Sequence, residues 1–405
     1  QLLWTRPHLR EDMDVVILAA GAGTRMRPLT DRTPKPLLPV GDRPLVAHVA
    51  DAAVDAGATS LVLVVGADSG PIRAALGDRY HGVPVTYAVQ DPPEGTAEAV
   101  RTAMTHLNGS FAVLNGDNLY DAESIDALLD AGPSIGVHEV SDPSAYGVVE
   151  IDDGRVTGLV EKPSSPPTSL ANAGAYVFPD ADPETFDVDR SDRGEFELTD
   201  VVARIAATGD VTPIEIERWM DVGRPWELLE ANEAVVPTYQ GRVDGDVHET
   251  AVVDPQAVVE SGAQIPPGRV IEGAVLVRDG ATLGPNARVR GTTLVDTNAS
   301  VGHAVEVNNS VLAPGSTVAH LSYVGDSVVG PDANLGAGTN VANLRHDDAD
   351  VQLTVAGDRV STDRRKFGAV VGPGVKTGIN TSIYPGVTLS TGATTVPGDV
   401  VDRDR

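Results

Sequence analysis

The chain has 405 residues, 41% of them hydrophobic and only 4% aromatic, and its 30 basic and 58 acidic residues give a formal net charge of −28. Single hydrophobic cores stop growing near about 250–300 residues, so this length predicts two domains, with cores of small aliphatic side chains rather than disorder throughout. Phosphate backbones repel so acidic a surface, which argues against a nucleic-acid partner because the densest basic run, Arg364–Lys366, is short.

The residue types that the sequence lacks exclude further kinds of site and of protein. There is no Cys, and therefore no disulfide, thiolate metal site or Cys nucleophile. No apolar run approaches the ~18 residues of a membrane span, so we expect a cytoplasmic protein without a membrane partner. An acidic surface with only four Lys is typical of a salt-rich cytoplasm, where screening weakens self-repulsion, and we expect a halophilic protein.

The N-terminal part of the chain alternates between apolar runs and helical patterns. Residues 1–12 lack the apolar stretch of a signal peptide, and we expect them to form a disordered extension before Met13, the natural start. The following alternation predicts a Rossmann-like α/β domain over residues 13–236, with a mostly parallel sheet and ligands at the carboxyl ends of its strands. The expected strands are 15–18, 61–65, 83–89 and 111–114, and the expected helices are 45–56, 96–107 and 225–235.

The C-terminal part of the chain has a period of six. Val253, Val259 and Ile265 begin a run of aliphatic residues that continues at steps of six to Val307, and the period slips near residues 310–325 before it resumes. This period is the signature of a left-handed parallel β-helix, which we expect over residues 251–400 after a linker at 237–250. The segment 343–367 breaks the period and is predicted to loop out; such loops often carry function.

A glycine-rich loop follows the first predicted strand. It contains Gly21, Gly23, Thr24 and Arg25, and Lys35 follows ten residues after Arg25. A loop of this kind lets backbone N–H groups approach phosphate oxygens closely, although a pair of turn glycines would look the same. Met26 occupies the place of the third glycine in the dinucleotide fingerprint, and the chain lacks the Gly-Lys-Ser/Thr of a P-loop, so neither of those folds fits.

The complete string from Gly21 to Pro36 resembles the signature of the sugar-1-phosphate nucleotidyltransferase family, and further motifs follow in family order. The resemblance implies that nucleotide contacts come from Leu18, Ala20, Gly21, Gly23, Thr24, Gln90, Gly95 and Thr96. It implies that sugar-phosphate contacts come from Gly147, Glu161, Lys162 and Asn172. Asp117 and Asp221 match the two carboxylates that hold Mg²⁺ in this family.

The reaction of that family explains these residue types. An oxygen of the sugar 1-phosphate attacks the α-phosphorus of a nucleoside triphosphate, UTP or dTTP, and pyrophosphate leaves. Two polyanions must meet, so Mg²⁺ on Asp117 and Asp221 would offset their repulsion. Arg25 and Lys35 are the expected catalytic cations on the triphosphate. Gln90 offers one donor and one acceptor, which suits the edge of a pyrimidine.

The period-six region contains a second set of motifs. The runs 301–310, 320–323 and 334–339, followed by Asn343, resemble the acetyltransferase domain of the bifunctional uridylyltransferase and glucosamine-1-phosphate acetyltransferase family. The resemblance implies that His320 is the general base that deprotonates a sugar amine for attack on acetyl-CoA, a role that suits imidazole. It also implies an oxyanion-binding backbone N–H at Ala337. The matching sugar-phosphate contacts are Arg290, Asn308, Tyr323 and Asn334.

Two positions depart from that second pattern. Asn308 stands where the family has a Lys, and Leu344 stands where it has a Tyr. The sequence nevertheless favours an enzyme with both activities, acting in UDP-N-acetylglucosamine synthesis as a homotrimer. Two alternatives stay open: a glucose-1-phosphate thymidylyl- or uridylyltransferase whose β-helix only forms trimers, and a non-catalytic scaffold subunit. The sequence leaves the base and the sugar open.

Overall fold

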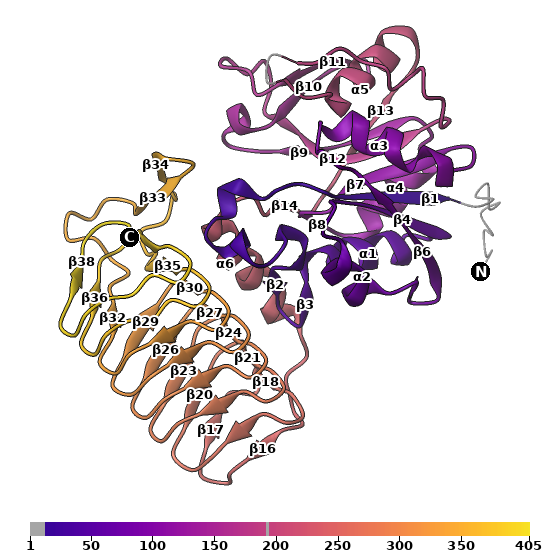
Figure 1. Cartoon of the computed structure of the whole chain (residues 1–405). Helices are drawn as coiled ribbons and strands as arrows, with labels where there is room; N and C mark the ends of the chain where they lie inside the picture. Colours follow the sequence, from indigo (N-terminus) through magenta and orange to yellow (C-terminus); the bar gives the residue numbers. More distant parts are fainter. Residues whose placement is uncertain (1–12, 192–193) are drawn as a thin grey trace. The chain divides into compact units, whose positions relative to one another are not determined.

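The computed structural model describes residues 13–191 and 194–405 and divides the chain into two compact units (Figure 1). The described part of the first unit consists of residues 13–21, 45–191 and 194–221, and the second unit consists of 22–44 and 222–405. The expected extension at residues 1–12 lies outside the described residues. None of the helices that the structure describes has the length and apolar character needed to span a bilayer.

The first unit is built on a ten-stranded mixed sheet. Its main path runs in the order β11-β10-β12-β7-β1-β4-β6-β5, and β9 and β13 extend it from β12. The strands are β1 (Asp14–Ala19), β4 (Ser60–Val65), β5 (Arg79–Tyr80), β6 (Val83–Val89), β7 (Phe111–Asn115), β9 (Ser134–Glu139), β10 (Gly147–Asp152), β11 (Arg155–Glu161), β12 (Leu170–Phe178) and β13 (Thr212–Glu215). A separate two-stranded sheet pairs β8 (Asn118–Tyr120) with β14 (Trp219–Asp221).

The predicted Rossmann-like core is confirmed. The four expected strands are β1, β4, β6 and β7, and they pair in parallel. Strand order reverses between β1 and β7, so the crevice beyond their carboxyl ends is the place where such sheets bind ligands. The antiparallel flank of β10, β11 and β12 was not predicted.

Helices α1 (Leu45–Asp55) and α3 (Thr96–Ala103) match the predicted helices, but α3 ends four residues early and a 3₁₀ turn (Met104–His106) follows. The other helices of this unit are α2 (Gly70–Leu76), α4 (Ala122–Asp130) and α5 (Leu198–Thr208). Buried residues of α3 and α5 pack with three aromatic rings of the sheet region, Phe111, Phe178 and Phe186, in one core.

The second unit contains the predicted β-helix, which consists of three parallel sheets. The first sheet holds β15 (Arg242–Val243), β18 (Val258–Val259), β21 (Val275–Val277), β24 (Thr293–Val295), β27 (Val311–Leu312), β30 (Val328–Val329), β35 (Ala369–Val371) and β37 (Val387–Leu389). The second holds β16 (Asp246–Val247), β19 (Gln264–Ile265), β22 (Thr282–Leu283), β25 (Ser300–Val301), β28 (Thr317–Val318) and β31 (Asn334–Leu335). The third holds β17 (Val252–Val253), β20 (Val270–Glu272), β23 (Arg288–Arg290), β26 (Glu306–Asn308), β29 (Tyr323–Gly325), β32 (Asn340–Val341), β36 (Ser382–Ile383) and β38 (Val400–Val401).

These strands begin earlier than predicted. Arg242–Val243 already pairs in parallel with β18, so part of the segment expected as a linker belongs to the β-helix. The aliphatic residues of the period-six run point inward and form one buried column with almost no exposed surface. This burial is the reason for the period, because each turn of the solenoid places one aliphatic side chain per sheet on the axis.

The slip in the period is two short coils. Val277 pairs with Val295 at a spacing of 18 residues, but Val295 pairs with Leu312, and Leu312 with Val329, at a spacing of 17. In both short coils the missing residue lies in the corner between the third sheet and the first. The segment predicted to loop out leaves the solenoid at the same kind of corner, after Val341, and forms the hairpin β33 (Gln352–Val355) and β34 (Asp358–Ser361).

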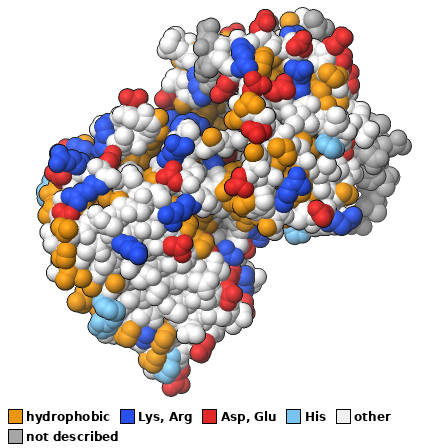
Figure 2. Space-filling view, viewed as in Figure 1, with side chains coloured by type: hydrophobic (Ala, Val, Ile, Leu, Met, Phe, Trp, Pro, Cys, Tyr) orange, Lys and Arg blue, Asp and Glu red, His pale blue; other side chains and the backbone are white. Residues whose placement is uncertain are grey.

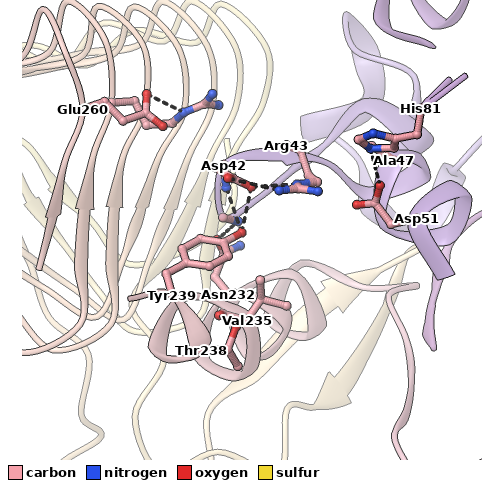
Figure 3. Close-up of polar contacts among 12 residues, drawn as sticks. Asp42, Arg43, Ala47, Asp51, His81, Asn232, Val235, Thr238, Tyr239 and Glu260 are labelled. Atoms are coloured by element: carbon pink, nitrogen blue, oxygen red, sulfur yellow. Dashed lines mark hydrogen bonds and ion pairs between the residues drawn. The ribbon is translucent and has the colours of Figure 1, made fainter. Parts of the chain in front are cut away.

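The remaining segments of the second unit pack beside the solenoid. The segment 22–44 contains three 3₁₀ turns (Thr24–Met26, Leu29–Asp31 and Lys35–Leu37) and the short strands β2 (Pro39–Val40) and β3 (Arg43–Pro44). Helix α6 (Pro225–Val235) has the predicted bounds. Asn232 of α6 accepts a hydrogen bond from the Gly41 N–H at 2.8 Å, and Tyr239 donates to Asp42 at 2.9 Å (Figure 3).

The solenoid also touches the segment 22–44 directly. Thr391 donates a hydrogen bond to the Asp31 carboxylate at 2.6 Å. A cavity of about 260 Å³ lies between the segment, α6 and the solenoid, and its lining includes Leu37, Leu228 and Val311. The segment that carries Lys35 is therefore part of the same folded unit as the β-helix.

Candidate functional site

The loops after β1 and β7 approach each other closely in the first unit. The Gly116 N–H donates to the Leu18 carbonyl at 2.9 Å, and a Cβ atom at Gly116 would lie 2.5 Å from that oxygen. Only glycine fits there. This contact brings the predicted nucleotide residues Leu18, Ala20 and Gly21 beside Asp117, at the crevice where strand order reverses.

Of the two predicted metal carboxylates, Asp221 ends strand β14 of the small sheet and Asp117 lies in the turn directly before β8. Asp221 pairs in register with Asn118, the residue that follows Asp117, so the backbones of the two acids are neighbours. Asn118 is buried, and its Oδ1 has no hydrogen-bond partner within the described residues. No third His, Asp or Glu completes a metal cage with them among the described residues. Two carboxylates with an orphaned amide oxygen nearby fit Mg²⁺, which usually takes one or two protein carboxylates plus substrate phosphates.

One carbonyl group holds this region together. The Ala173 oxygen accepts hydrogen bonds from Asn118 Nδ2 at 2.9 Å, Tyr120 Oη at 3.0 Å and Trp219 Nε1 at 2.9 Å. Burial first, and then the nearby Asp117 charge, raise the pKa of the Tyr120 phenol well above its usual range. Tyr120 therefore stays a neutral donor and holds β8 to β12, while Trp219 holds β14 to the same carbonyl.

The predicted sugar-phosphate residues of the first unit lie together on the antiparallel flank. Gly147 pairs in register with Glu161, and a Cβ at Gly147 would lie 2.9 Å from a Glu161 carboxylate oxygen and 3.4 Å from Asn172 Cβ. Lys162 follows in the left-handed backbone region (φ 45°), and its N–H donates to the Tyr146 carbonyl at 3.0 Å. The structure thus gathers all four residues at one end of β10 and β11.

The predicted base-recognition segment, which contains Gln90, Gly95 and Thr96, packs closely against residues 196–198. Buried Gln90 donates through Nε2 to the Gly95 carbonyl at 3.0 Å, which leaves its Oε1 to accept a hydrogen bond. The Thr96 hydroxyl accepts from the Leu198 N–H at 2.9 Å at the start of α5. Gly95 has φ +120°, and a Cβ there would lie 2.4 Å from the Phe196 carbonyl oxygen.

The remaining predicted nucleotide residues belong to the second unit. Gly23 has φ +60°, and a Cβ there would lie 2.9 Å from Lys35 Cβ, so glycine lets the loop cross the Lys35 stem. Thr30 donates to the Gly23 carbonyl at 2.8 Å. Lys35 is buried, with 7% of its surface exposed, whereas Thr24 and Arg25 are exposed. A buried cation beside a glycine turn can neutralise a polyphosphate.

The predicted acetyl-transfer residues lie on the solenoid, around the corner between its second and third sheets. His320 is exposed there, and the His303 N–H lies 3.4 Å from its Nδ1, a contact longer than an ordinary hydrogen bond. Ala337 lies one coil further on, and its N–H makes no hydrogen bond within the described part of the chain. Pro occupies the same corner position in other coils, at 267, 285 and 397. Because Pro has no backbone N–H, the regular coil makes no hydrogen bond at this position, and the Ala337 N–H therefore lacks a partner among the described residues.

The other predicted residues flank this corner on two sheets. Arg290 and Asn308 pair in register on the third sheet, and Arg290 donates to Glu306 at 2.7 Å. Glu306 in turn pairs with Tyr323, so these residues share one face. Asn334 lies on the second sheet, opposite Thr317. One chain therefore places His320 and Ala337 at this corner, Arg290, Asn308 and Tyr323 on the third sheet, and Asn334 on the second sheet.

Beside His320 the backbone adopts an unfavourable conformation. Each coil from the second onward has a left-handed residue at this corner, usually Gly or Asn, but here it is Leu321 with φ 58°. A bulky side chain in this region costs roughly 1–2 kcal/mol. Leu321 is also 65% exposed, and Figure 2 shows hydrophobic side chains gathered with histidine along one edge of the β-helix.

The sequence analysis assigned no role to the residues behind Tyr323. The Tyr323 hydroxyl accepts a hydrogen bond from Asn343 Nδ2 at 3.2 Å, and the same Nδ2 donates to buried Asp326 at 2.5 Å. Asn343 was named among the matched motifs, whereas Asp326 lies three residues beyond the matched run 320–323. The sequence signal that could have found Asp326 is an acid at the exact corner where the period loses a residue.

Two family profiles and several known proteins are similar to this chain. The profile described as nucleotidyl transferase matches residues 14–237, and the profile described as GMPPB C-terminal domain matches residues 271–367. The bifunctional protein GlmU of Methanococcus aeolicus is 34% identical over 400 residues, which cover 97% of this chain and 96% of the relative. The bifunctional sugar-1-phosphate nucleotidylyltransferase/acetyltransferase of Sulfurisphaera tokodaii is 35% identical over 400 residues, 97% of this chain and 98% of the relative.

A solved structure matches a smaller part of the chain. The crystal structure assigned as a glucose-1-phosphate thymidylyltransferase from Bacillus anthracis, in complex with sucrose, is 30% identical with a TM-score of 0.51. It covers 57% of this chain and 98% of its own. A single-activity protein of that size leaves more than a third of this chain without a counterpart.

We expect Gly95→Ala to disrupt the base-recognition segment. The new Cβ would meet the Phe196 backbone in a conformation that L-residues avoid, so the free energy of unfolding should fall by roughly 2–4 kcal/mol. Chemical denaturation measures this, and the control is Gly70→Ala, where no atom lies within 4 Å. Equal stability of the two variants would show that the segment 94–97 does not pack against 196–198.

Proposed function

Because the chain belongs to the family of bifunctional sugar-1-phosphate nucleotidylyltransferase/acetyltransferase proteins, we propose that it carries out both reactions. It transfers a nucleotidyl group from UTP or dTTP to a hexose or N-acetylhexosamine 1-phosphate, and an acetyl group from acetyl-CoA to an amino-sugar 1-phosphate. Residues 13–236 serve the first reaction and the β-helix serves the second. The observation that carries the proposal is similarity to bifunctional relatives over 97% of the chain.

In nucleotidyl transfer, a sugar-phosphate oxygen forms a bond to the α-phosphorus, the bond to the bridging oxygen breaks, and pyrophosphate leaves. Arg25 and Lys35 bind the triphosphate and stabilise the departing pyrophosphate, because positioning and charge stabilisation supply most of the catalysis in such transfers. Lys162, beside Glu161 and Asn172, holds the sugar phosphate. The free Oε1 of Gln90 accepts from the ring N–H that uracil and thymine share.

Asp117 and Asp221 are the residues that hold Mg²⁺ in this proposal. When bound, the ion neutralises charge on the nucleotide and sugar phosphates. The chain's own contribution is to hold Asp221 on β14 and Asp117 directly before β8, and the Ala173 carbonyl fixes these two paired strands through Asn118, Tyr120 and Trp219.

In acetyl transfer, the sugar amine attacks the thioester carbonyl carbon, the C–S bond breaks, and coenzyme A leaves as its thiol. His320 takes the proton that the amine loses, and this proton passes to the departing sulfur. The unpaired N–H of Ala337 stabilises the oxyanion. Arg290, Tyr323 and Asn334 hold the sugar phosphate, and Asn308 adds a neutral amide rather than a second cation.

The two alternative functions explain fewer of the structural features of the chain. A thymidylyltransferase with a purely structural β-helix explains the similarity to the Bacillus anthracis structure but gives no role to the open Ala337 N–H or to exposed His320. A scaffold subunit gives no role to buried Lys35 or to Asp117 and Asp221, whose backbones are neighbours.

A reciprocal pair of variants tests the proposal. Lys35→Ala should lower pyrophosphate release below about one hundredth of wild type and leave coenzyme A release intact, because the residues serve separate reactions. His320→Ala should lower coenzyme A release by roughly 10²–10⁴-fold and leave pyrophosphate release intact. Each variant is the other's control. Loss of both activities in either folded variant would contradict two separate sites, and no coenzyme A release by the wild type would contradict acetyl transfer.

We also propose that the chain forms a homotrimer, because the acetyl-site residues of one chain lie on both sides of a solenoid edge. Sedimentation at micromolar concentration in about 1 M salt should give three times the chain mass of 42.1 kDa. In about 0.1 M salt the trimer should dissociate, since its charge is three times −28 and the Debye length grows from ~3 to ~10 Å. A monomer in molar salt would contradict this arrangement.

A further inference from the structure

Two residues occupy an unusual position in the solenoid. At the corner between the third and first sheets, earlier coils place Gly273 and Gly291 in the left-handed region. The two short coils place Asn309 (φ 47°) and Asp326 (φ 46°) at the same position. Side chains in this region are uncommon, and such departures cluster at functional sites. The corner therefore carries polar side chains where the fold alone would need only glycine.

Asp326 is buried and bridges two amides. Its Oδ1 accepts from Asn309 Nδ2 at 2.8 Å, and its Oδ2 accepts from Asn343 Nδ2 at 2.5 Å. Only 4% of its surface is exposed. An ionised carboxylate can only accept hydrogen bonds, so both amides must turn their N–H groups toward it.

The bridge is anchored from helix α6 and from the inserted segment. Asn309 Nδ2 also donates to the Glu233 carboxylate of α6 at 2.6 Å. Arg364, at the end of the inserted segment, forms ion pairs with Glu233 at 2.5 Å and Glu230 at 3.2 Å. These contacts all lie within the second unit, and several are charge-assisted, which makes them stronger than neutral hydrogen bonds.

The orientation that Asp326 imposes determines what the neighbouring groups offer. Asn343 donates through Nδ2 to Asp326 and to the Tyr323 hydroxyl, so its Oδ1 remains as an acceptor. Because Tyr323 accepts from Asn343, its own proton is directed elsewhere as a donor. Burial, and then the Asp326 charge, raise the pKa of the Tyr323 phenol, which keeps that proton in place.

We propose that Asp326 is a positioning residue for acetyl transfer, and this inference rests on the proposed acetyltransferase function. Through Asn343 it presents an acceptor to the N–H groups of an amino sugar, and through Tyr323 a donor to the sugar phosphate. The arrangement selects an amine-bearing sugar 1-phosphate over one with a hydroxyl at that carbon, since the amine offers more donors. Glu233, which is paired with Arg364, stabilises the arrangement by accepting a hydrogen bond from Asn309.

The test substitutes Asp326→Asn, which preserves shape but adds donors. The new amide cannot accept from both neighbours on its two sides, so one of them must turn. Asn309 is held by its second hydrogen bond to Glu233, so we expect Asn343 to turn and to offer its N–H groups to the amine. We expect kcat/KM for glucosamine 1-phosphate to fall by about 10–100-fold, because small misplacements at a reacting centre have effects of this size. The KM for acetyl-CoA and the rate of pyrophosphate release should not change.

The matched control is Asp296→Asn. Asp296 is a buried carboxylate of the same solenoid, 2% exposed and paired with Arg278. It should lower the melting temperature without altering the KM for glucosamine 1-phosphate. If Asp326→Asn does not fold, Glu233→Gln replaces it, since it weakens the anchor of Asn309 and should raise the same KM.

The outcomes separate this inference from the proposed function. A wild-type protein that releases no coenzyme A with any amino-sugar 1-phosphate overturns acetyl transfer itself. A wild type that acetylates, with wild-type kcat and KM in the folded Asp326→Asn or Glu233→Gln variant, overturns the positioning role alone. The positioning role is also overturned if Asp326→Asn and Asp296→Asn both raise the KM for glucosamine 1-phosphate and the KM for acetyl-CoA by the same factor. That pattern would indicate general destabilisation.

Discussion

The aliphatic column inside the β-helix is the constraint on which the rest of the second unit depends. Its inward-pointing residues are almost completely buried, and consecutive coils pair in parallel register along three sheets. Neighbouring strands lie about 4.7–4.9 Å apart, so a side chain on one coil has fixed neighbours on the next. A register slip of one residue would turn this column outward, so irregularities can be accommodated only at the corners.

The principal irregularities of the β-helix lie at the corners between its third and first sheets. The two short coils each lose a residue between the third and first sheets, and the inserted hairpin leaves the solenoid at the same kind of corner. Helix α6 packs there through Glu233, which contacts both Asn309 and Arg364. The regular sheets thus provide a rigid frame, and the irregular corner provides the polar groups behind Tyr323.

The division of the chain places a nucleotide segment on this frame. The segment 22–44, with buried Lys35, belongs to the unit of the β-helix, whereas Asp117 and Asp221 belong to the other unit. Contacts such as Thr391 with Asp31 and Tyr239 with Asp42 hold the segment to the solenoid region. Burial first raises the pKa of the Tyr239 phenol to about 12, so this contact stays intact over the physiological range.

Much of this arrangement could be predicted from the sequence, because it follows from periodic patterns and short motifs. The parallel strands β1, β4, β6 and β7 follow from uninterrupted apolar runs, and the β-helix follows from its period of six. The antiparallel flank was not predicted, since it depends on long-range pairing. The roles of Asp326 and Glu233 were not predicted either, because these residues are 93 positions apart in sequence and are linked only in the folded corner, through Asn309.

The central claim is that the acetyl site is built by the short coils. Insertion of one glycine between Asp326 and Ser327 restores the 18-residue spacing of the second short coil without removing any side chain. The account predicts a folded protein with wild-type pyrophosphate release and coenzyme A release reduced by about 10²-fold or more, because Asp326 no longer reaches Asn343. Coenzyme A release within about twofold of wild type in the folded insertion variant would contradict it.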